Sequence, residues 1–337
     1  MRKRHRRGFW SWLPASDKDY EMKQLFKKFS TLIILLILFI LFSAASENFL
    51  KMNNILNILR QISVLGILTC GMTFVIISGG MDLTVGAYLG LTGVIAAKLM
   101  GDVGLPVPVA VVLTMLIITL VGLATGCMIV GLNVSAIVIT LGMMTVVRGL
   151  AYIISGGLPV YDLPESIVNF GQGYIFKVPV PVIVMLVIVI IMALILKYSY
   201  FGRYVYAIGG NVEAAKLAGV GVGKITASLY AISAFLAAVA GIVLAGRISS
   251  GAPASGNGTE MDVVTAVVIG GVSINGGKGS MAGAFFGAVI IGILSNGLTI
   301  LNVGEYYQQV VKGTVLIFAV AFDVLANREK VKRVKEA

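Results

Sequence analysis

Long apolar runs constrain this chain more than any other feature. The sequence has 337 residues, of which 58% are hydrophobic and only 12% are charged. Because about 20 helical residues cross a hydrocarbon core, repeated runs near that length favour membrane-spanning helices over the helices of a soluble core. We therefore predict an all-α polytopic membrane protein with about ten transmembrane helices. They are expected at residues 30–45, 62–78, 83–100, 107–130, 134–155, 178–197, 225–246, 262–275, 280–301 and 307–326.

The eighth run is the weakest of these predicted spans. It is short, and Gly270 and Gly271 interrupt it. Interrupted helices in transporters commonly line a cavity near the middle of the membrane, so a broken helix is expected here.

A polar stretch divides the apolar runs into two sets of five. It lies near residues 198–224, inside a single transmembrane domain predicted for residues 30–326. An odd number of helices in each half would place the halves in opposite orientation, so an inverted 5+5 repeat is possible. Basic tails are predicted at residues 1–29 and 327–337.

Basic residues indicate the orientation. Lys and Arg gather before the first run, after the last run and in the central stretch. Such residues accumulate in short cytoplasmic loops, so both termini and the central stretch are expected to be cytoplasmic. This placement also accounts for the net charge of +11 without a nucleic-acid partner.

The inventory of reactive side chains argues against an enzyme. The only histidine is His5, in the first tail, so we predict no catalytic residue, no metal site and no cofactor. The segment Gly277-Lys278-Gly279-Ser280 resembles a phosphate loop, but Val272 stands where the leading glycine belongs and Gly279 where Ser or Thr belongs. An ATP-driven mechanism therefore requires a nucleotide site on another chain.

Charges within the predicted spans are few. Asp262 opens the eighth run and Asp323 closes the tenth, and no carboxylate is expected near the membrane midplane. Ion-coupled carriers usually place carboxylates there, which argues against that class. Arg148 lies well inside a span, where both a structural role and a position on a polar path are open.

Paired glycines four residues apart recur on the predicted helices. This spacing exposes bare backbone on one helix face and favours close packing, either within the chain or against a second copy. The pairs are Gly86 with Gly90, Gly122 with Gly126, and Gly283 with Gly287.

The central stretch contains a short predicted helix. Residues 213–218 read Glu-Ala-Ala-Lys-Leu-Ala and favour a helix, with Asn211 as N-cap and Gly219 as C-cap. Glu213 in the first turn suits the helix dipole. The interpretation is either a rigid knob that fits a groove on a partner or a plain capped connector.

Several motifs, taken in order, resemble a known family over about residues 50 to 326. The chain is similar to permease subunits of ABC sugar importers, the ribose, xylose and galactoside group with the vitamin-B12-type (type II) transmembrane fold. The matching segments are Gly79 to Gly86, Ile139 to Gly142 with Arg148-Gly149, Gly202 to Gly219, Glu260 to Asp262, Ile269 to Ser273, Gly276 to Gly279, Asn296 to Leu298, and Tyr307-Gln308 with Val311 to Gly313.

The resemblance implies partners and a coupling role for the central helix. It implies that this helix seats on an ABC ATPase subunit, and it further implies a second permease copy, a periplasmic or extracellular sugar-binding protein and a location in the bacterial cytoplasmic membrane. The residues expected to carry the ATPase contact are Arg203, Asn211, Glu213, Ala214, Ala215 and Gly219.

Other candidate residues are expected along the transport route. Asp82 is interpreted first as the N-cap of the helix at 83–100 and second as part of a gate. Arg60 and Arg247 are expected on the outer side, where they either contact a binding protein or anchor the membrane interface. Weak hydrogen bonds to a passing sugar are expected from Tyr152, Asn296, Tyr306, Tyr307 and Gln308.

The favoured hypothesis is an importer permease for a monosaccharide, with a ribose-like sugar first. One alternative is an ATP-independent secondary carrier or channel. Another is a related ABC permease for nucleosides, branched-chain amino acids or a furanosyl signalling molecule.

Overall fold

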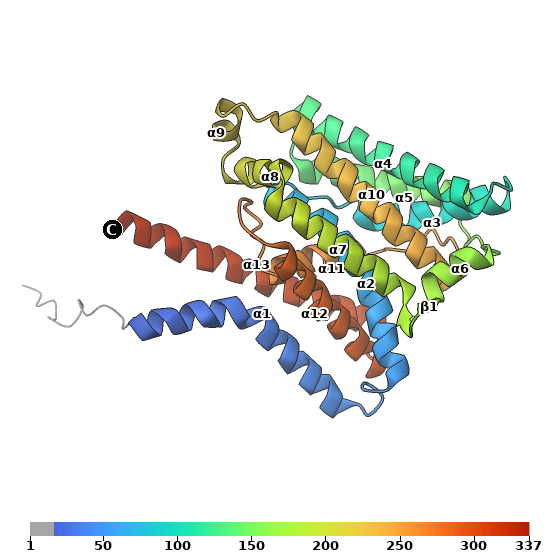
Figure 1. Cartoon of the computed structure of the whole chain (residues 1–337), viewed down its shortest axis with the longest axis horizontal. Helices are drawn as coiled ribbons and strands as arrows, with labels where there is room; N and C mark the ends of the chain where they lie inside the picture. The colour runs from blue at the N-terminus through green and yellow to red at the C-terminus, as the bar shows by residue number, and fades with distance from the viewer. Residues whose placement is uncertain (1–16, 337) are drawn as a thin grey trace, which may run out of the picture.

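The computed structural model describes residues 17–336, almost entirely as helices that run roughly along one direction (Figure 1). A two-stranded hairpin, β1 (Tyr174–Ile175) with β2 (Val178–Pro179), joins the helices. The helices are α1 (Asp17–Ala45), α2 (Met52–Ile77), α3 (Val85–Gly101), α4 (Val107–Leu132), α5 (Ala136–Ser155), α6 (Glu165–Gln172), α7 (Val180–Tyr198), α8 (Tyr200–Gly210), α9 (Val212–Leu217), α10 (Val222–Ile248), α11 (Thr259–Ile269), α12 (Met281–Ile300) and α13 (Glu305–Glu336).

Within residues 17–336, six helices are long and apolar enough to cross a membrane: α2, α4, α5, α7, α10 and α12. Two shorter apolar helices accompany them, Thr31–Ala45 within α1 and α3. The prediction of an all-α polytopic membrane protein is confirmed. The predicted count of ten spans is not, because only six of the described helices are both long and apolar enough.

Helix boundaries differ from the prediction in three places. Helix α2 begins at Met52, ten residues before the expected start, because polar residues at its beginning hid the helix from a hydropathy reading. Helix α11 covers Thr259–Ile269 and not 262–275, since the chain turns at Gly271 with a positive φ of 83°. Helix α1 begins at Asp17 and α13 continues to Glu336, so helix replaces part of each predicted tail. Residues 1–16 of the basic tail, with His5, lie outside the described part.

The core is built around α2 and α10. These two helices pack against each other, and α10 also contacts α4 and α3 while α2 contacts α12 and α7. Both helices carry large, fully buried side chains, such as Phe74 of α2 and Tyr230 of α10. Helices α4, α5 and α7 instead turn many apolar side chains outward, as expected where lipid or a second protein is the neighbour.

The three glycine pairs all pack within the chain. Gly122 and Gly126 of α4 lie on α10, and Gly283 and Gly287 of α12 lie on the backbone of α11. Gly86 and Gly90 of α3 face the backbone of residues 253–256. Of the two interpretations left open, internal packing is confirmed for each pair.

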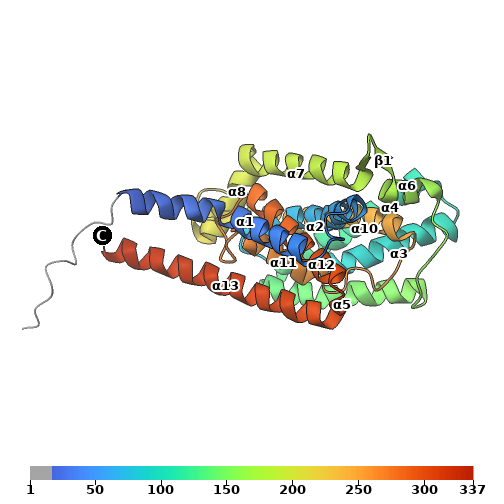
Figure 2. The same cartoon turned by 90° about the horizontal axis from the view of Figure 1, so that it is seen from below.

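The two ends of the helix bundle carry different elements. Helix α9, the C-terminal end of α13 and the beginning of α1 lie toward one end, while α6 and the β1–β2 hairpin lie toward the other (Figures 1 and 2). Within residues 17–336, the two ends of the described chain and the central stretch therefore lie at the same end of the bundle.

Non-helical chain enters the protein interior before α3 and before α11. Residues 249–258 connect α10 to α11 and pack along α3, and Gly251 of this segment pairs with Val160 in an isolated antiparallel bridge. Residues 78–84 connect α2 to α3 and include the fully buried Asp82 and Thr84. Irregular backbone at membrane depth is tolerated only where protein or a polar cavity surrounds it.

Candidate functional site

Helix α9 is the predicted short helix, and it projects from the bundle. The Oδ1 atom of Asn211 accepts a hydrogen bond from the Ala214 backbone N–H at 3.0 Å, so the N-cap prediction is confirmed. Glu213 and Lys216 form an ion pair at 2.9 Å on the exposed side. Only Ala215 of this helix is buried, while Leu217 is 91% exposed.

The end of α9 is closed by glycine. Gly219 adopts a φ of 81° directly after the C-cap residue Ala218, a conformation that costs glycine little. The N–H of Gly219 donates to Lys216 and that of Val220 donates to Ala215, which is the Schellman pattern. The prediction that Gly219 ends the helix is therefore confirmed, one residue beyond the C-cap.

Helix α8 connects α9 to the core through close backbone contacts. Gly209 of α8 lies directly on the backbone of Ile77, the last residue of α2, and of Gly277. Gly277 N–H in turn donates to the Ile77 carbonyl at 2.8 Å. The loop between α11 and α12 is thus held between α2 and α8.

Two side chains strengthen the attachment of α8. The Tyr206 hydroxyl donates to the Gly279 carbonyl at 2.8 Å, and burial raises the pKa of this phenol, which keeps the donor protonated. The ring of Phe201 lies 6.1 Å from that of Phe74 on α2. Arg203 points to solvent and stacks on Tyr200, with its guanidinium carbon 4.2 Å from the ring centroid.

At the opposite end, the structure brings Arg60 and Arg247 together. Arg60 Nη2 donates to the Gln172 carbonyl at 2.9 Å, and Gln172 Nε2 donates to the Arg247 carbonyl at 3.0 Å. Arg247 Nη2 donates to Asn57 Oδ1 at 3.1 Å, and Arg60 lies over the ring of Tyr174. Both arginines are therefore fixed by α6 and its neighbours, and their predicted contact with a binding protein stays a prediction.

Asp82 is not the N-cap that the sequence suggested. Its Oδ1 atom accepts from Thr84 N–H at 3.0 Å ahead of α3, and its Oδ2 atom accepts from the Ser233 hydroxyl on α10 at 2.7 Å. The side chain is 1% exposed, so a carboxylate does lie within the apolar interior. Packing against α10 thus buries a carboxylate that follows two glycines in a loop.

Arg148 faces a second buried carboxylate. Its Nη2 atom lies 3.7 Å from Oε2 of Glu260, which belongs to the first turn of α11. Asp262 lies in the same first turn of α11 and pairs with Lys312 of α13, Oδ2 to Nζ, at 2.7 Å. Helix α11 is thus tied to α5 by one ion pair and to α13 by another.

The remaining predicted path residues are not gathered in one place. Asn296 is buried and exchanges two amide hydrogen bonds with Asn54, at 3.1 and 3.0 Å, which join α12 to α2. Gln308 donates to the Val303 carbonyl at 2.9 Å. Tyr152 and Tyr307 are exposed on α5 and α13. Tyr306 is exposed as well. Glu260 was expected only as part of a family motif. Nothing in the sequence pattern indicates that its carboxylate is buried against Gly86.

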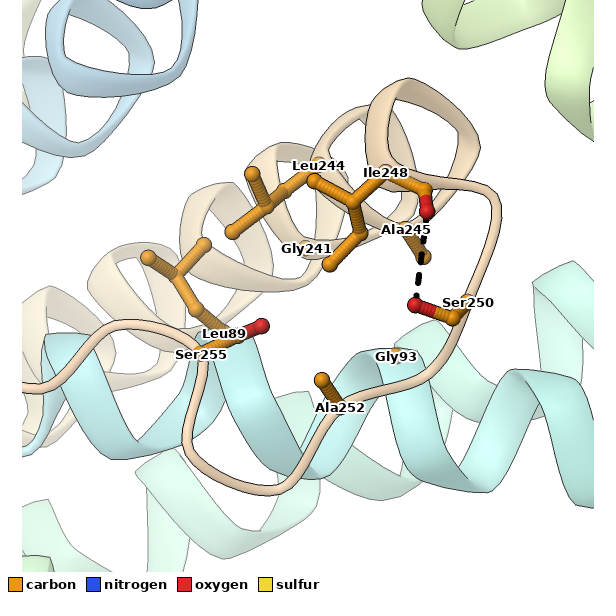
Figure 3. A pocket seen from close by; sticks show the side chains of 9 residues that line it. All are labelled: Leu89, Gly93, Gly241, Leu244, Ala245, Ile248, Ser250, Ala252 and Ser255. Atoms are coloured by element: carbon orange, nitrogen blue, oxygen red, sulfur yellow. Dashed lines mark hydrogen bonds between the residues drawn. The ribbon is translucent and has the colours of Figure 1, made fainter. Parts of the chain in front are cut away.

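A small depression between α3 and α10 holds no space for a ligand. Figure 3 shows its lining, with Leu89 and Gly93 on α3 and Leu244 on α10, and the Ser250 hydroxyl turned toward the Ile248 carbonyl. Among the residues that the structure describes, no group of three or more His, Cys, Asp and Glu side chains is placed to hold a metal ion.

The fold and these features define a class: a multi-pass helical membrane protein whose polar segments serve packing and contact. Comparison with known proteins gives the family. Residues 54–320 match the family described as branched-chain amino acid transport system / permease component, and the chain belongs to this family. It is therefore a transport component and not an enzyme, as the sequence predicted.

Several curated relatives align along most of the chain. The ribose import permease protein RbsC of Haemophilus influenzae is 40% identical over 302 residues, covering 88% of this chain and 93% of the relative. The protein of the same name from Escherichia coli K12 is 39% identical, covering 92% and 97%. The xylose transport system permease protein XylH of Escherichia coli K12 is 30% identical, covering 94% and 96%. No solved structure matches this chain.

Proposed function

We propose that this chain is the membrane permease of an ATP-driven ABC importer for a monosaccharide, with ribose as the first candidate. The observation that carries the proposal is the identity of 39–40% with two ribose import permeases over nearly their whole length. The similarity to a xylose permease supports the broader class of pentoses. The family description names branched-chain amino acids, which makes such an amino acid the alternative cargo.

The proposed energy source is an ATPase subunit that binds α9. In its support, α9 is capped at both ends, stands out from the bundle and presents Leu217 to the outside. A rigid helix with an exposed apolar side chain loses little conformational entropy on docking, which favours α9 as a contact that transmits movement. The proposed contact includes Arg203, Asn211, Glu213, Ala214 and Gly219, while the buried Ala215 positions the helix.

The proposed assembly has two permease copies, ATPase subunits and an external sugar-binding protein that approaches Arg60 and Arg247. Both termini and α9 are placed in the cytoplasm, in a bacterial cytoplasmic membrane. Their grouping at one end of the molecule supports this orientation, and the basic residues of the sequence set its direction.

We also assign ten helices to one transmembrane domain that contains an inverted repeat. The proposed halves are α1 to α5 and α7 with α10 to α13. The packing supports this division, because α2 contacts α12 as α10 contacts α4, and α3 contacts α5 as α11 contacts α13. In each half, the third helix begins after non-helical chain that enters the interior.

The transport path is proposed to run along the face where α5, α11 and α13 meet, with Arg148 on it. Tyr152, Tyr307 and Gln308 are retained as weak contacts on α5 and α13. Asp82 and Asn296 are assigned to holding helices in place, because their side-chain hydrogen bonds are made within the protein.

Uptake by the reconstituted complex tests the cargo and the energy source. Proteoliposomes with the permease, its ATPase and its binding protein are expected to accumulate labelled ribose only with ATP. Unlabelled leucine is expected not to compete. Accumulation without ATP would instead indicate a secondary carrier, and competition by leucine would indicate the alternative cargo.

Binding of the ATPase tests the role of α9. Leu217→Asp places a charge on the most exposed apolar side chain of the knob and is expected to weaken capture of the purified ATPase at least tenfold. Phe176→Asp makes the same kind of change at the tip of the β1–β2 hairpin, where Phe176 is 97% exposed at the opposite end. Equal capture by both variants and the wild type would exclude α9 from the interface.

A further inference from the structure

The pair formed by Arg148 and Glu260 is incomplete. The 3.7 Å between Arg148 Nη2 and Glu260 Oε2 exceeds the range of an N–H···O hydrogen bond. Both atoms are buried, and neither has a hydrogen-bond partner within the described residues. Glu260 is 92% buried, since only 8% of its side chain is exposed, whereas Arg148 retains 25% exposure. The pair is therefore partly accessible from the protein surface through the arginine.

The neighbouring pair on the same helix shows what a complete pair looks like. Asp262 and Lys312 meet at 2.7 Å, a full charge-assisted hydrogen bond. Both pairs join α11 to a neighbouring helix, so the two can be compared directly. The Arg148 pair differs in leaving one donor and one acceptor free, and leaving buried groups unsatisfied is costly.

The space beside Glu260 depends on a glycine. A Cβ atom at Gly86 would collide with Oε2 of Glu260 and with the carbonyl oxygen of Gly256. The carboxylate therefore lies on bare backbone of α3, with Oε2 facing Arg148. The carboxylate also belongs to the first turn of α11, where the helix dipole favours negative charge.

The free atoms specify the chemistry of what binds between them. Oε2 needs a donor, and the Nη2 N–H needs an acceptor. A hydroxyl is both at once, whereas a carboxylate cannot donate and an ammonium cannot accept. We infer that Arg148 and Glu260 form a binding station for a hydroxyl group of a neutral polyhydroxylated cargo. This inference rests on the proposed function, which supplies a sugar as that cargo.

Direct binding tests the station without partners or ATP. The full chain is placed in lipid nanodiscs, and saturation transfer from protein to ribose is measured by NMR. The signal is expected to fall at least fivefold in Glu260→Gln, because the amide is a weaker acceptor for the hydroxyl than a carboxylate. Asp262→Asn, the matched change at the complete pair, is expected to leave the signal within twofold of the wild type.

The control for folding is the double variant Arg148→Gln with Glu260→Gln, which removes both charges while the two amides can bond each other. It is expected to unfold at the temperature of the wild type and still to lose the ribose signal. Signals equal to the wild type in both Glu260 variants would overturn the inference and leave the gap as a site for bound water only.

Transport by the complex separates this inference from the proposed function. Glu260→Gln is expected to lower ATP-driven ribose uptake at least tenfold relative to the wild-type complex. No uptake by the wild-type complex would count against the proposed function, and the nanodisc result would still decide on the station. Full uptake by the variant would count against the station alone.

Discussion

Replacing Gly209 by alanine is the sharpest test of how α8 and α9 are held to the membrane core. The added Cβ would overlap the Ile77 carbonyl oxygen and lie 2.5 Å from the Gly277 nitrogen and 2.9 Å from the Ile77 carbonyl carbon. These are backbone atoms, so no flexible side chain can move aside. Helix α8 must therefore shift away from α2 and from the loop between α11 and α12.

The cost follows from the contacts that this shift breaks. Overpacking a tight contact costs about 1–3 kcal/mol. Two hydrogen bonds depend on the junction, Gly277 N–H to Ile77 and Tyr206 to Gly279, and each contributes about 1 kcal/mol. Alanine offsets about 1 kcal/mol through its higher helix propensity than glycine. The expected net loss in the free energy of unfolding is about 2–4 kcal/mol.

The next residue supplies the control. Gly210 is also in α8, but nothing lies within 4 Å of the position of its Cβ. Gly210→Ala is therefore expected to be neutral or stabilising by up to about 1 kcal/mol. The assay is unfolding of the purified permease together with hydrogen exchange of residues 271–280, which is expected to become faster in Gly209→Ala only. Equal stability and equal exchange in the two variants would refute the close contact.

Three further predictions concern side-chain hydrogen bonds. Asn211→Ala is expected to destabilise α9 by about 1 kcal/mol, which is measured as faster hydrogen exchange of residues 212–217. Asn211→Asp is expected to restore the protection, and unchanged exchange in the alanine variant would contradict the cap. Asn296→Leu is expected to cost about 1–3 kcal/mol because it removes both amide hydrogen bonds between the buried Asn296 and Asn54, with a lower unfolding temperature as the readout. The double change to leucine at both positions is expected to recover part of this loss, and a neutral single variant would argue against the pair. Ser233→Ala is expected to cost about 1.5–3 kcal/mol of unfolding free energy, because it removes a hydrogen-bond donor to the buried Asp82. Ser228→Ala, at a more exposed serine of α10, serves as the control. An equal effect of the two changes would contradict the bond between Ser233 and Asp82.

Local features were predictable from the sequence. Hydropathy located α3, α4, α5, α7 and α12 to within a few residues, because each is a continuous apolar run between polar or glycine-rich turns. The caps of α9 were predictable for a similar reason, since Asn211 and Gly219 act on backbone atoms only a few residues away.

Features that depend on distant contacts were not predictable. Asp82 is buried by Ser233, 151 residues further along, and Asn296 pairs with Asn54 across 242 residues. The carboxylate of Glu260 occupies a space that exists only because α3 presents Gly86 to it. A single sequence shows which residues are polar, but it does not show which helix will lie opposite them.

The same distant contacts connect the two regions proposed to act in transport. Helix α11 has 11 residues and is therefore about 16 Å long. Its first turn carries Glu260, and its end leads through Gly270 and Gly271 into the loop that holds Gly277 against α8. In the proposed mechanism, a shift of α8 under the pull of the ATPase acts on this loop and moves the short helix α11 as a rigid body. Asp262 and Lys312 anchor α11 to α13 with a complete pair. Such a movement therefore changes the distance between Glu260 and Arg148, whose pair is incomplete, most easily.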